Sequence, residues 1–259
     1  MRLSANLSLM FTEAPLLARF ALARAAGFDC VEIQFPYDHT PMALKAAADG
    51  LPIDLINVPA GAPERGYLGL ATDILQAGAF AAAVDSALRY ADALGVQKLN
   101  ILFGAPPAGQ GAEETAAHVT HNLRLAAGRL AAAGVQGLVE MINPFDSPGF
   151  WLSSLARTLD ALRAADHPNL RLQFDLYHMA RTEPDLLAAI TQAAPHIGHV
   201  QFADAPGRHE PGTGEIDFAA ARAALAQAGY AGVVAAEYKP LGDTLAGLGW
   251  MREWRAQTS

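Results

Sequence analysis

Short apolar runs recur along the chain, and each is followed by a longer stretch rich in Ala and Leu. Short runs of this kind, separated by helical patterns and bounded by Gly, Pro or polar residues, are typical of buried parallel strands. The pattern predicts strands at residues 3–9, 30–34, 53–58, 98–103, 137–142, 170–174, 197–202 and 233–237.

The stretches between these runs predict helices, because Ala and Leu favour the helical conformation. Several of them end in a glycine, which accepts the left-handed conformation that closes a helix. Gly27, Gly95, Gly134 and Gly229 occupy such positions. The expected helices cover about residues 14–26, 41–49, 76–94, 112–133, 153–165, 184–194, 217–228 and 243–255.

Strand and helix patterns alternate to the end of the chain without a break in composition, which predicts a single (β/α)8 TIM barrel domain over residues 1–259. An open doubly wound sheet is the alternative. Such sheets usually have fewer strands and often an early glycine-rich phosphate loop, which this chain lacks. In a barrel, the C-terminal rim of the strands carries the active site. Long loops rich in Gly and Pro follow four of the strands, at residues 59–75, 104–111, 143–152 and 203–216.

Polar side chains lie at or near the end of four apolar runs in the second half of the chain: Glu140, Asp175, Gln201 and Glu237. A carboxylate buried at a strand end costs several kcal/mol unless it is paired or bound to a metal. For any one of them, an ion pair with Lys or Arg is the alternative. Together, three carboxylates and an amide oxygen predict a divalent metal site that favours Mg²⁺ or Mn²⁺ over zinc.

Composition and charge narrow the classes of partner. The chain has a formal net charge of -8, which argues against nucleic acid or an anionic membrane surface and is compatible with a small-molecule substrate. The longest uncharged run, residues 186–203, contains Gln, His and Pro and predicts no membrane span. A lone cysteine, Cys30, excludes an internal disulfide and suits a cytoplasmic protein. No dinucleotide or phosphate-loop motif is present, so no organic cofactor is expected.

Two further residues are candidates for substrate binding. His178 follows Asp175 by three residues, so its ring is expected to point back into the pocket and hold a substrate oxygen. A loop histidine bonded to nearby backbone is the alternative. Arg208 lies in the loop before a Pro-Gly-Thr-Gly segment and suits a clamp for a substrate carboxylate. Lys239 and Arg65 are weaker candidates for the same role.

Other polar and aromatic residues are interpreted as structural. His199 has the same strand parity as Gln201, so we expect it to lie deeper in the barrel as a hydrogen-bonded core residue. Trp250 and Trp254 are expected to seal the outer layer of the barrel near the C-terminus. A homo-oligomer contact through the same tryptophans is the alternative.

The motifs around these residues resemble those of the hydroxypyruvate isomerase family. The resemblance covers nearly the whole chain and includes the segments EMINPFDSPGF at 140–150, FDLYHM at 174–179, GHVQFAD at 198–204, EPGTGE at 210–215 and EYKP at 237–240. The wider group is the xylose isomerase-like barrels, which include 2-oxo-tetronate isomerases, ketose 3-epimerases and a DNA-repair endonuclease branch.

The resemblance implies a role for each residue at the rim. Glu140, Asp175, Gln201 and Glu237 would bind the divalent metal, and Glu140 and Glu237 would also transfer the proton. His178 and Arg208 would contact the substrate. The reaction would interconvert hydroxypyruvate and tartronate semialdehyde (2-hydroxy-3-oxopropanoate) through a cis-enediolate. In the related epimerases a histidine usually stands where Gln201 does, so the glutamine points toward the hydroxypyruvate branch.

Several alternatives stay open at this point. Within the same chemistry, the substrate is either hydroxypyruvate, a four-carbon 2-oxo-tetronate, or a ketose that undergoes 3-epimerisation. An AP-type endonuclease would carry several zinc ions, more histidines at the strand ends and a basic surface, which this composition does not favour. A non-catalytic sugar-binding barrel is a further alternative, which metal-dependent turnover would exclude.

Overall fold

A computed structural model of the protein describes residues 1–61 and 68–256. Within these residues, eight parallel strands form a closed barrel in which each strand pairs with the next and the last pairs with the first. The strands are β1 (Arg2–Asn6), β2 (Cys30–Ile33), β3 (Ile53–Asn57), β4 (Lys98–Ile101), β5 (Gln136–Glu140), β6 (Leu170–Asp175), β7 (Ile197–Phe202) and β8 (Val233–Ala236). The predicted (β/α)8 TIM barrel is therefore confirmed, with every strand end within three residues of its expected position.

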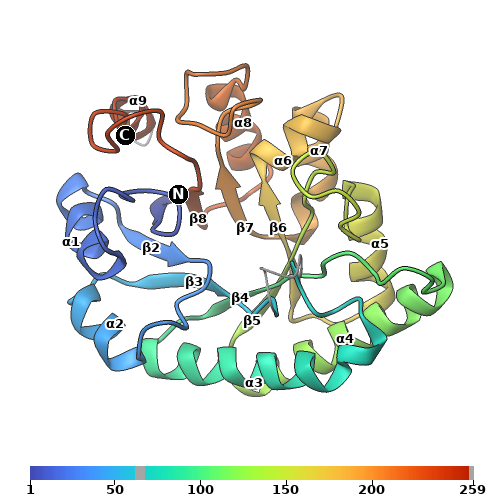
Figure 1. Ribbon diagram of the computed structural model, residues 1–259. Coiled ribbons are helices and arrows are strands. Elements are labelled where there is room, and N and C mark those ends of the chain that lie inside the picture. The colour runs from blue at the N-terminus through green and yellow to red at the C-terminus, as the bar shows by residue number, and fades with distance from the viewer. Residues whose placement is uncertain (62–67, 257–259) are drawn as a thin grey trace.

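Helices surround the barrel on its outer side (Figure 1). They are α1 (Leu16–Ala26), α2 (Pro41–Ala48), α3 (Ala77–Leu94), α4 (Ala112–Ala132), α5 (Leu155–Ala165), α6 (Leu176–Thr182), α7 (Leu186–Ala193), α8 (Phe218–Gln227) and α9 (Trp250–Ala256), with short 3-10 turns η2 (Ile74–Gln76) and η3 (Ala194–His196). Gly27 and Gly95 have positive φ angles of 90° and 73° and end α1 and α3, as the sequence predicted.

The strands are buried on both faces, as is usual for a parallel sheet covered by helices. All four residues of β2 and all four of β8 are buried. Apolar side chains such as Phe20, Leu44, Phe80 and Leu123 bury the inner faces of the helices. Several residues on the strands are instead polar and almost fully buried, among them Glu32, Asn100, Gln173 and His199.

Two expectations about helices were wrong. The C-terminal helix expected from about residue 243 begins only at Trp250, because Gly242, Gly247 and Gly249 interrupt the preceding segment, which forms isolated turns. In addition, α6 starts directly after β6, where no helix was expected. His178 therefore lies on a helix and not in a loop.

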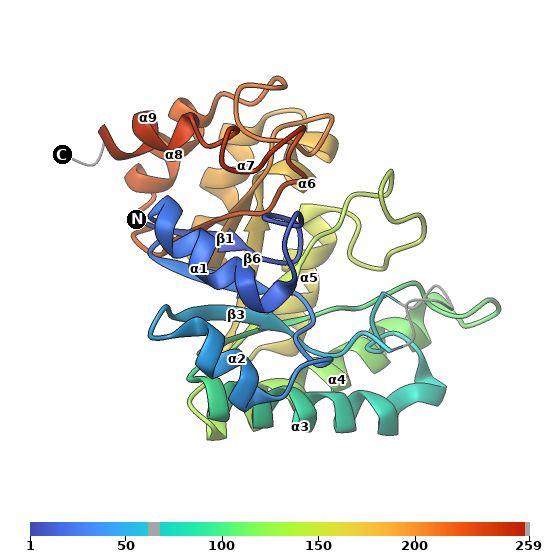
Figure 2. The same ribbon diagram turned by 60° about the vertical axis from the view of Figure 1, so that its left-hand side comes forward.

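The long loops leave the barrel on one side, where the strands end. Figure 2 shows the loops after β4 and β5, in green and yellow-green, projecting together from this side. Near the C-terminus, Trp254 stacks on Phe202 with ring centroids 5.4 Å apart, and Trp250 meets the same ring edge-on at 5.2 Å. These contacts confirm that both tryptophans seal the outer layer. No helix in the described part of the chain is long and apolar enough to span a membrane.

Candidate active site

A cavity of about 640 Å³, here called the rim cavity, lies at the C-terminal ends of the strands. Its lining includes Glu140, Asp146, His178, Arg208, Glu237 and Lys239. These residues come from β5, α6 and the segments that follow β5, β7 and β8, so the barrel brings distant parts of the chain to one place. Arg65 lies outside the described residues.

Asp175 lies between β6 and α6, and its two carboxylate oxygens have different surroundings. Its Oδ1 accepts a hydrogen bond from the backbone N–H of Tyr177 at 2.8 Å and thereby caps the N-terminus of α6. Its Oδ2 is buried and has no hydrogen-bond partner among the described residues. A buried carboxylate oxygen without a partner is costly, so this atom indicates a place for a ligand at the site.

Glu140 ends β5 beside Asp175. Its Oε2 accepts a hydrogen bond from Asn100 Nδ2 at 2.7 Å, which fixes the carboxylate. Atoms of Glu140, Asp175 and His178 lie within 4.8 Å of one another, and all three residues are buried. Burial, together with repulsion from Glu237 and Asp175, raises the pKa of Glu140 well above its usual value. Burial and the charge of Glu237 raise the pKa of Asp175 to about 7.

A divalent cation fits this donor set. Closely spaced buried carboxylates repel one another in their charged form, and a bound cation removes that repulsion. Glu140 and Asp175 contribute carboxylate oxygens, which Mg²⁺ and Mn²⁺ prefer. The Oδ2 of Asp175, which accepts no hydrogen bond from the described residues, supplies one donor atom at the cluster, 3.5 Å from His178 Nε2.

The hydrogen bonds of His178 determine which ring nitrogen carries the proton. The backbone N–H of Asn143 donates to Nδ1 at 3.3 Å, and Asn143 Nδ2 lies 2.7 Å from the same nitrogen. Burial and the nearby charge of Arg208 lower the pKa of His178 well below its usual value, so the ring is neutral. Because Nδ1 accepts, the proton is on Nε2, which faces Asp175 and Glu140. His178 is thus a hydrogen-bond donor to the cavity and not a lone-pair ligand.

Glu237 follows β8 and is the most heavily hydrogen-bonded of the three carboxylates. Its Oε1 accepts from Asn6 Nδ2 at 3.0 Å and from Gln34 Nε2 at 2.9 Å, and its Oε2 accepts from Arg208 at 2.7 Å. Burial raises the pKa of Glu237, while Arg208 opposes the shift. The carboxylate neighbours of Arg208 raise its pKa despite its burial, so the guanidinium stays protonated.

Gln201 lies on β7 at the same end of the barrel, with its amide already oriented. Its Nε2 donates to Glu32 Oε1 at 2.6 Å, and its Oε1 accepts from Gln173 Nε2 at 2.7 Å. A carbonyl oxygen has two lone pairs, so the bond from Gln173 leaves one for a cation. The carboxylate of Glu32 accepts only, which fixes the amide with its oxygen turned away from Glu32.

Glu32 is a residue of the site region that was not predicted, although its position in the sequence carries a signal. It is fully buried and bonds to three side chains: Asn6 Nδ2 at 2.8 Å, Gln201 Nε2 at 2.6 Å and His199 Nε2 at 2.9 Å. A glutamate inside an apolar run carries the same desolvation cost as Glu140, so the same reasoning would have found it. His199 is fully buried and bonded to Glu32, which confirms its interpretation as a satisfied core residue.

The loop that carries Arg208 is fixed by Asp204 at the end of β7. Its carboxylate accepts four backbone hydrogen bonds of 2.8–3.1 Å, from Ala205 and Ile216 at Oδ1 and from Gly212 and Gly214 at Oδ2. A Cβ at Gly214 would lie 2.0 Å from the carbonyl oxygen of Ala205, so only glycine fits there. Arg208 itself has a φ of 59°, which is uncommon for a residue with a side chain. The loop therefore holds Arg208 in a set position over the cavity.

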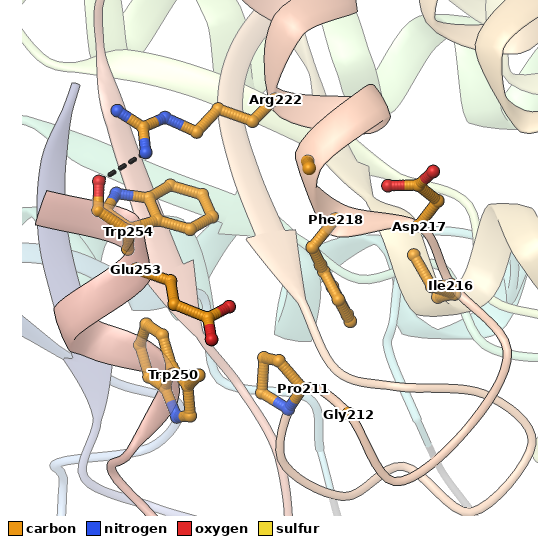
Figure 3. Close-up of a pocket in the computed structure, with 10 residues that line it drawn as sticks. Pro211, Gly212, Ile216, Asp217, Phe218, Arg222, Trp250, Glu253 and Trp254 are labelled. Atoms are coloured by element: carbon orange, nitrogen blue, oxygen red, sulfur yellow. Dashed lines mark hydrogen bonds between the residues drawn. The ribbon is translucent and has the colours of Figure 1, made fainter. Parts of the chain in front are cut away.

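A second cavity, of about 400 Å³, lies between α8, α9 and the loop after β7 (Figure 3). The rings of Phe218, Trp250 and Trp254 and the carboxylates of Asp217 and Glu253 surround it. It shares no lining residue with the rim cavity and holds none of the strand-end carboxylates. The chemistry therefore belongs to the rim cavity.

The raised pKa values predict how the stability of the metal-free protein depends on pH. Because the pKa of Asp175 rises from 3.8 to about 7 on folding, the folded state binds this proton more tightly than the unfolded state. The corresponding stability is fully present below about pH 4 and is lost as pH rises through about 7. Urea unfolding in a chelator at several pH values should show this loss.

Adding Mg²⁺ or Mn²⁺ above pH 7 should restore the lost stability, because a cation binds the folded state. Asp175→Asn is the matched control, since asparagine keeps the helix cap but cannot titrate. Its stability should vary less with pH than that of the wild type. Identical pH profiles for the two proteins would contradict the assignment.

Comparison with known proteins agrees with the fold and with the sequence motifs. Residues 20–254 match the model of the xylose isomerase-like TIM barrel family. A hydroxypyruvate isomerase of Escherichia coli K12 is 43% identical over 98% of this chain and 100% of its own length. A 2-oxo-tetronate isomerase of Cupriavidus necator is 36% identical over 98% of both chains. A crystal structure described as an AP endonuclease, family 2, from Brucella melitensis is 35% identical over 98% of both chains, with a TM-score of 0.94.

The chain therefore belongs to the xylose isomerase-like TIM barrel family. Within this family it groups with the hydroxypyruvate isomerases and 2-oxo-tetronate isomerases, and it is an isomerase. The family resemblance expected from the motifs is confirmed.

Proposed function

We propose that this isomerase interconverts hydroxypyruvate and 2-hydroxy-3-oxopropanoate by proton transfer through a cis-enediolate. The observation that carries the proposal is the buried carboxylate cluster at the rim, in which Asp175 Oδ2 accepts no hydrogen bond from the described residues and the pKa values of Glu140 and Asp175 are raised. The relatives named hydroxypyruvate isomerase support the choice of substrate.

Glu140, Asp175, Gln201 and Glu237 would hold Mg²⁺ or Mn²⁺ at this cluster. The cation would supply Lewis acidity to oxygens of the substrate. The rest of the chemistry is assigned to side chains of the protein. No organic cofactor takes part in this scheme.

Proton transfer requires one group that removes a proton from C3 and another that delivers one to C2, with the hydroxyl proton passing from O3 to O2. Glu237 is the better base, because Asn6, Gln34 and Arg208 donate hydrogen bonds that stabilise its charged form. Glu140 receives one hydrogen bond in the described structure, from Asn100, so it holds a proton more readily and is the better acid. General acid–base catalysis of this kind contributes about 10²- to 10⁴-fold to the rate.

His178 and Arg208 would orient the substrate. The Nε2–H of His178 points into the cavity, so it would donate to a substrate oxygen. Arg208 lies over the ring of Tyr177, 5.1 Å from its centroid, and its guanidinium reaches the same cavity. The guanidinium of Arg208, held in this way, would stabilise negative charge as it develops on the substrate.

The test is proton NMR in D₂O with hydroxypyruvate and metal-stripped protein, with and without Mg²⁺ or Mn²⁺. Cation-dependent formation of 2-hydroxy-3-oxopropanoate with deuterium at C2 is the expected result. Calorimetric titration of the cation into wild type and Asp175→Asn gives an independent readout, since the variant should bind the cation more weakly. Absence of both turnover and exchange with either cation would exclude the proposed reaction.

A four-carbon 2-oxo-tetronate is the second candidate substrate. It is supported by the relatives of that name at 34–36% identity and by the volume of the rim cavity, which accommodates one more carbon. The ratio of kcat/KM for the two acids in the same NMR assay distinguishes them. Cleavage of DNA at abasic sites is not expected, because a net charge of -8 disfavours the phosphate backbone.

A further inference from the structure

The rim cavity contains two cations among its described lining residues, and one of them already pairs with carboxylates of the protein. Arg208 lies close to three carboxylates: 2.7 Å from Glu237, 3.8 Å from Asp146 and 3.9 Å from Asp175. Its charge therefore compensates acids of the protein. With Glu140 protonated as proposed, Asp146, Asp175 and Glu237 carry three negative charges, which Arg208 and a divalent cation together balance. Neither cation therefore leaves a surplus of positive charge for the carboxylate of a substrate.

Lys239 is the other cation, and its backbone is firmly placed. Its N–H donates to the carbonyl oxygen of Arg208 at 2.9 Å, and its own carbonyl oxygen lies 2.7 Å from Nδ1 of His209. These contacts tie the segment after β8 to the loop after β7. Lys239 is therefore held next to Arg208 at the mouth of the cavity.

The side chain of Lys239 is available for a ligand. Lys239 is exposed, and it lines the rim cavity together with the buried Glu237 two positions earlier. Its ammonium group forms no ion pair with any residue that the structure describes. A cation without a partner, beside a pocket rich in carboxylates, attracts a negatively charged group of the substrate.

We propose that Lys239 binds the carboxylate of the substrate and thereby selects 2-oxo acids over neutral ketoses. This inference rests on the proposed isomerase reaction. A 2-oxo acid and the corresponding ketose share the carbonyl and the transferred proton, and they differ in a carboxylate against a hydroxymethyl group. One ammonium group therefore stabilises the acid and contributes little to the ketose, and such a difference in affinity constitutes specificity.

The test compares hydroxypyruvate with dihydroxyacetone, its neutral counterpart, by deuterium exchange in the wild type and in Lys239→Met. For hydroxypyruvate, KM should rise about tenfold or more, which is the loss expected for one charged hydrogen bond. The kcat should change much less, because Lys239 does not touch the reacting carbons. At equal enzyme concentration, Lys239→Met and the wild type should exchange deuterium into dihydroxyacetone at the same rate.

Two further variants serve as controls. Lys239→Arg keeps the positive charge and should recover most of the affinity for hydroxypyruvate. Lys45→Met removes a charge from α2, where the ammonium group contacts the carbonyl oxygen of Ala93 at 3.4 Å, and it should leave both substrates unaffected. Equal losses for both substrates in Lys239→Met, or no loss for either, would overturn the proposal.

The experiment also separates this inference from the proposed function. If the wild type exchanges no proton in either compound, the isomerase reaction on these substrates fails. The inference about Lys239 is then decided by calorimetric binding of hydroxypyruvate and dihydroxyacetone. A preference for the acid that disappears in Lys239→Met supports it, and a preference that persists, or none in the wild type, overturns it.

Discussion

Glu237→Gln is expected to reduce deuterium exchange into hydroxypyruvate by about 10³-fold, within the range for loss of a general base. Glutamine has the same shape and accepts hydrogen bonds at its carbonyl oxygen, but it cannot take up the C3 proton. Three donors surround this carboxylate, Asn6, Gln34 and Arg208, so the side chain is already oriented for the reaction. The measurement is single-substrate proton NMR in D₂O with the cation present.

Glu140→Gln distinguishes the two glutamates. If Glu237 removes the proton and Glu140 returns one, Glu140→Gln should still exchange the C3 proton of hydroxypyruvate while forming little isomer. Glu237→Gln should do neither. The reverse pattern would exchange the two roles, and full turnover in both variants would remove them from the reaction.

The fold should survive these substitutions, and the assay needs a control for it. Both variants should retain the far-ultraviolet circular dichroism spectrum of the wild type. Glu215→Gln is the matched control, because Glu215 is exposed in the loop after β7 and does not line the rim cavity. Its activity should equal that of the wild type. Cation binding by each variant, followed by calorimetry, separates loss of the metal from loss of the proton-transfer group.

Glu32→Ala is expected to lower the free energy of unfolding by about 3–5 kcal/mol, the loss typical when one partner of a buried charged network is removed. Alanine leaves the side chains of Asn6, His199 and Gln201 without their buried acceptor. Each unsatisfied donor costs about 1–3 kcal/mol, although relaxation of the barrel reduces the sum. Urea unfolding followed by fluorescence measures the change.

Glu32→Gln and Glu114→Ala are the controls for this prediction. Glutamine preserves the volume at position 32 and one acceptor oxygen, so its loss should be smaller than that of alanine. Glu114 is exposed on α4, and its removal should change stability by less than about 0.5 kcal/mol. A loss below about 1 kcal/mol for Glu32→Ala would show that the network contributes little to folding.

The same variant should also affect the cation site. Glu32 accepts from Gln201 Nε2 and thus holds the amide oxygen away from itself. Without this bond the Gln201 amide is free to rotate, and we expect weaker cation binding by Glu32→Ala than by the wild type. The hydrogen bond between Asn6 and Glu237 links the network to the proposed base as well.

Much of the fold could be predicted because a parallel barrel leaves a strong local pattern. Each strand is buried on both faces and reads as an apolar run, and several helices end at a glycine. The prediction was wrong for the segment before Trp250, where apolar Leu and Ala alternate with Gly242, Gly247 and Gly249. It also missed α6, because a helix of seven residues that begins directly after the last residue of a strand has too few positions to show a period.

The sequence alone indicated that four polar residues lie at or next to strand ends: Glu140, Asp175, Gln201 and Glu237. A polar residue at the end of a buried strand has a desolvation cost, and the apolar run before it makes that cost visible in the sequence. The sequence also placed His199 deeper in the barrel, through strand parity. Tertiary structure alone decided which atoms meet. Glu32 and His199 are 167 positions apart, and the pairing of Arg208 with Glu237 depends on a loop that Asp204 folds. Hydrogen bonds between distant strands depend on the closure and register of the whole barrel, which no local pattern records.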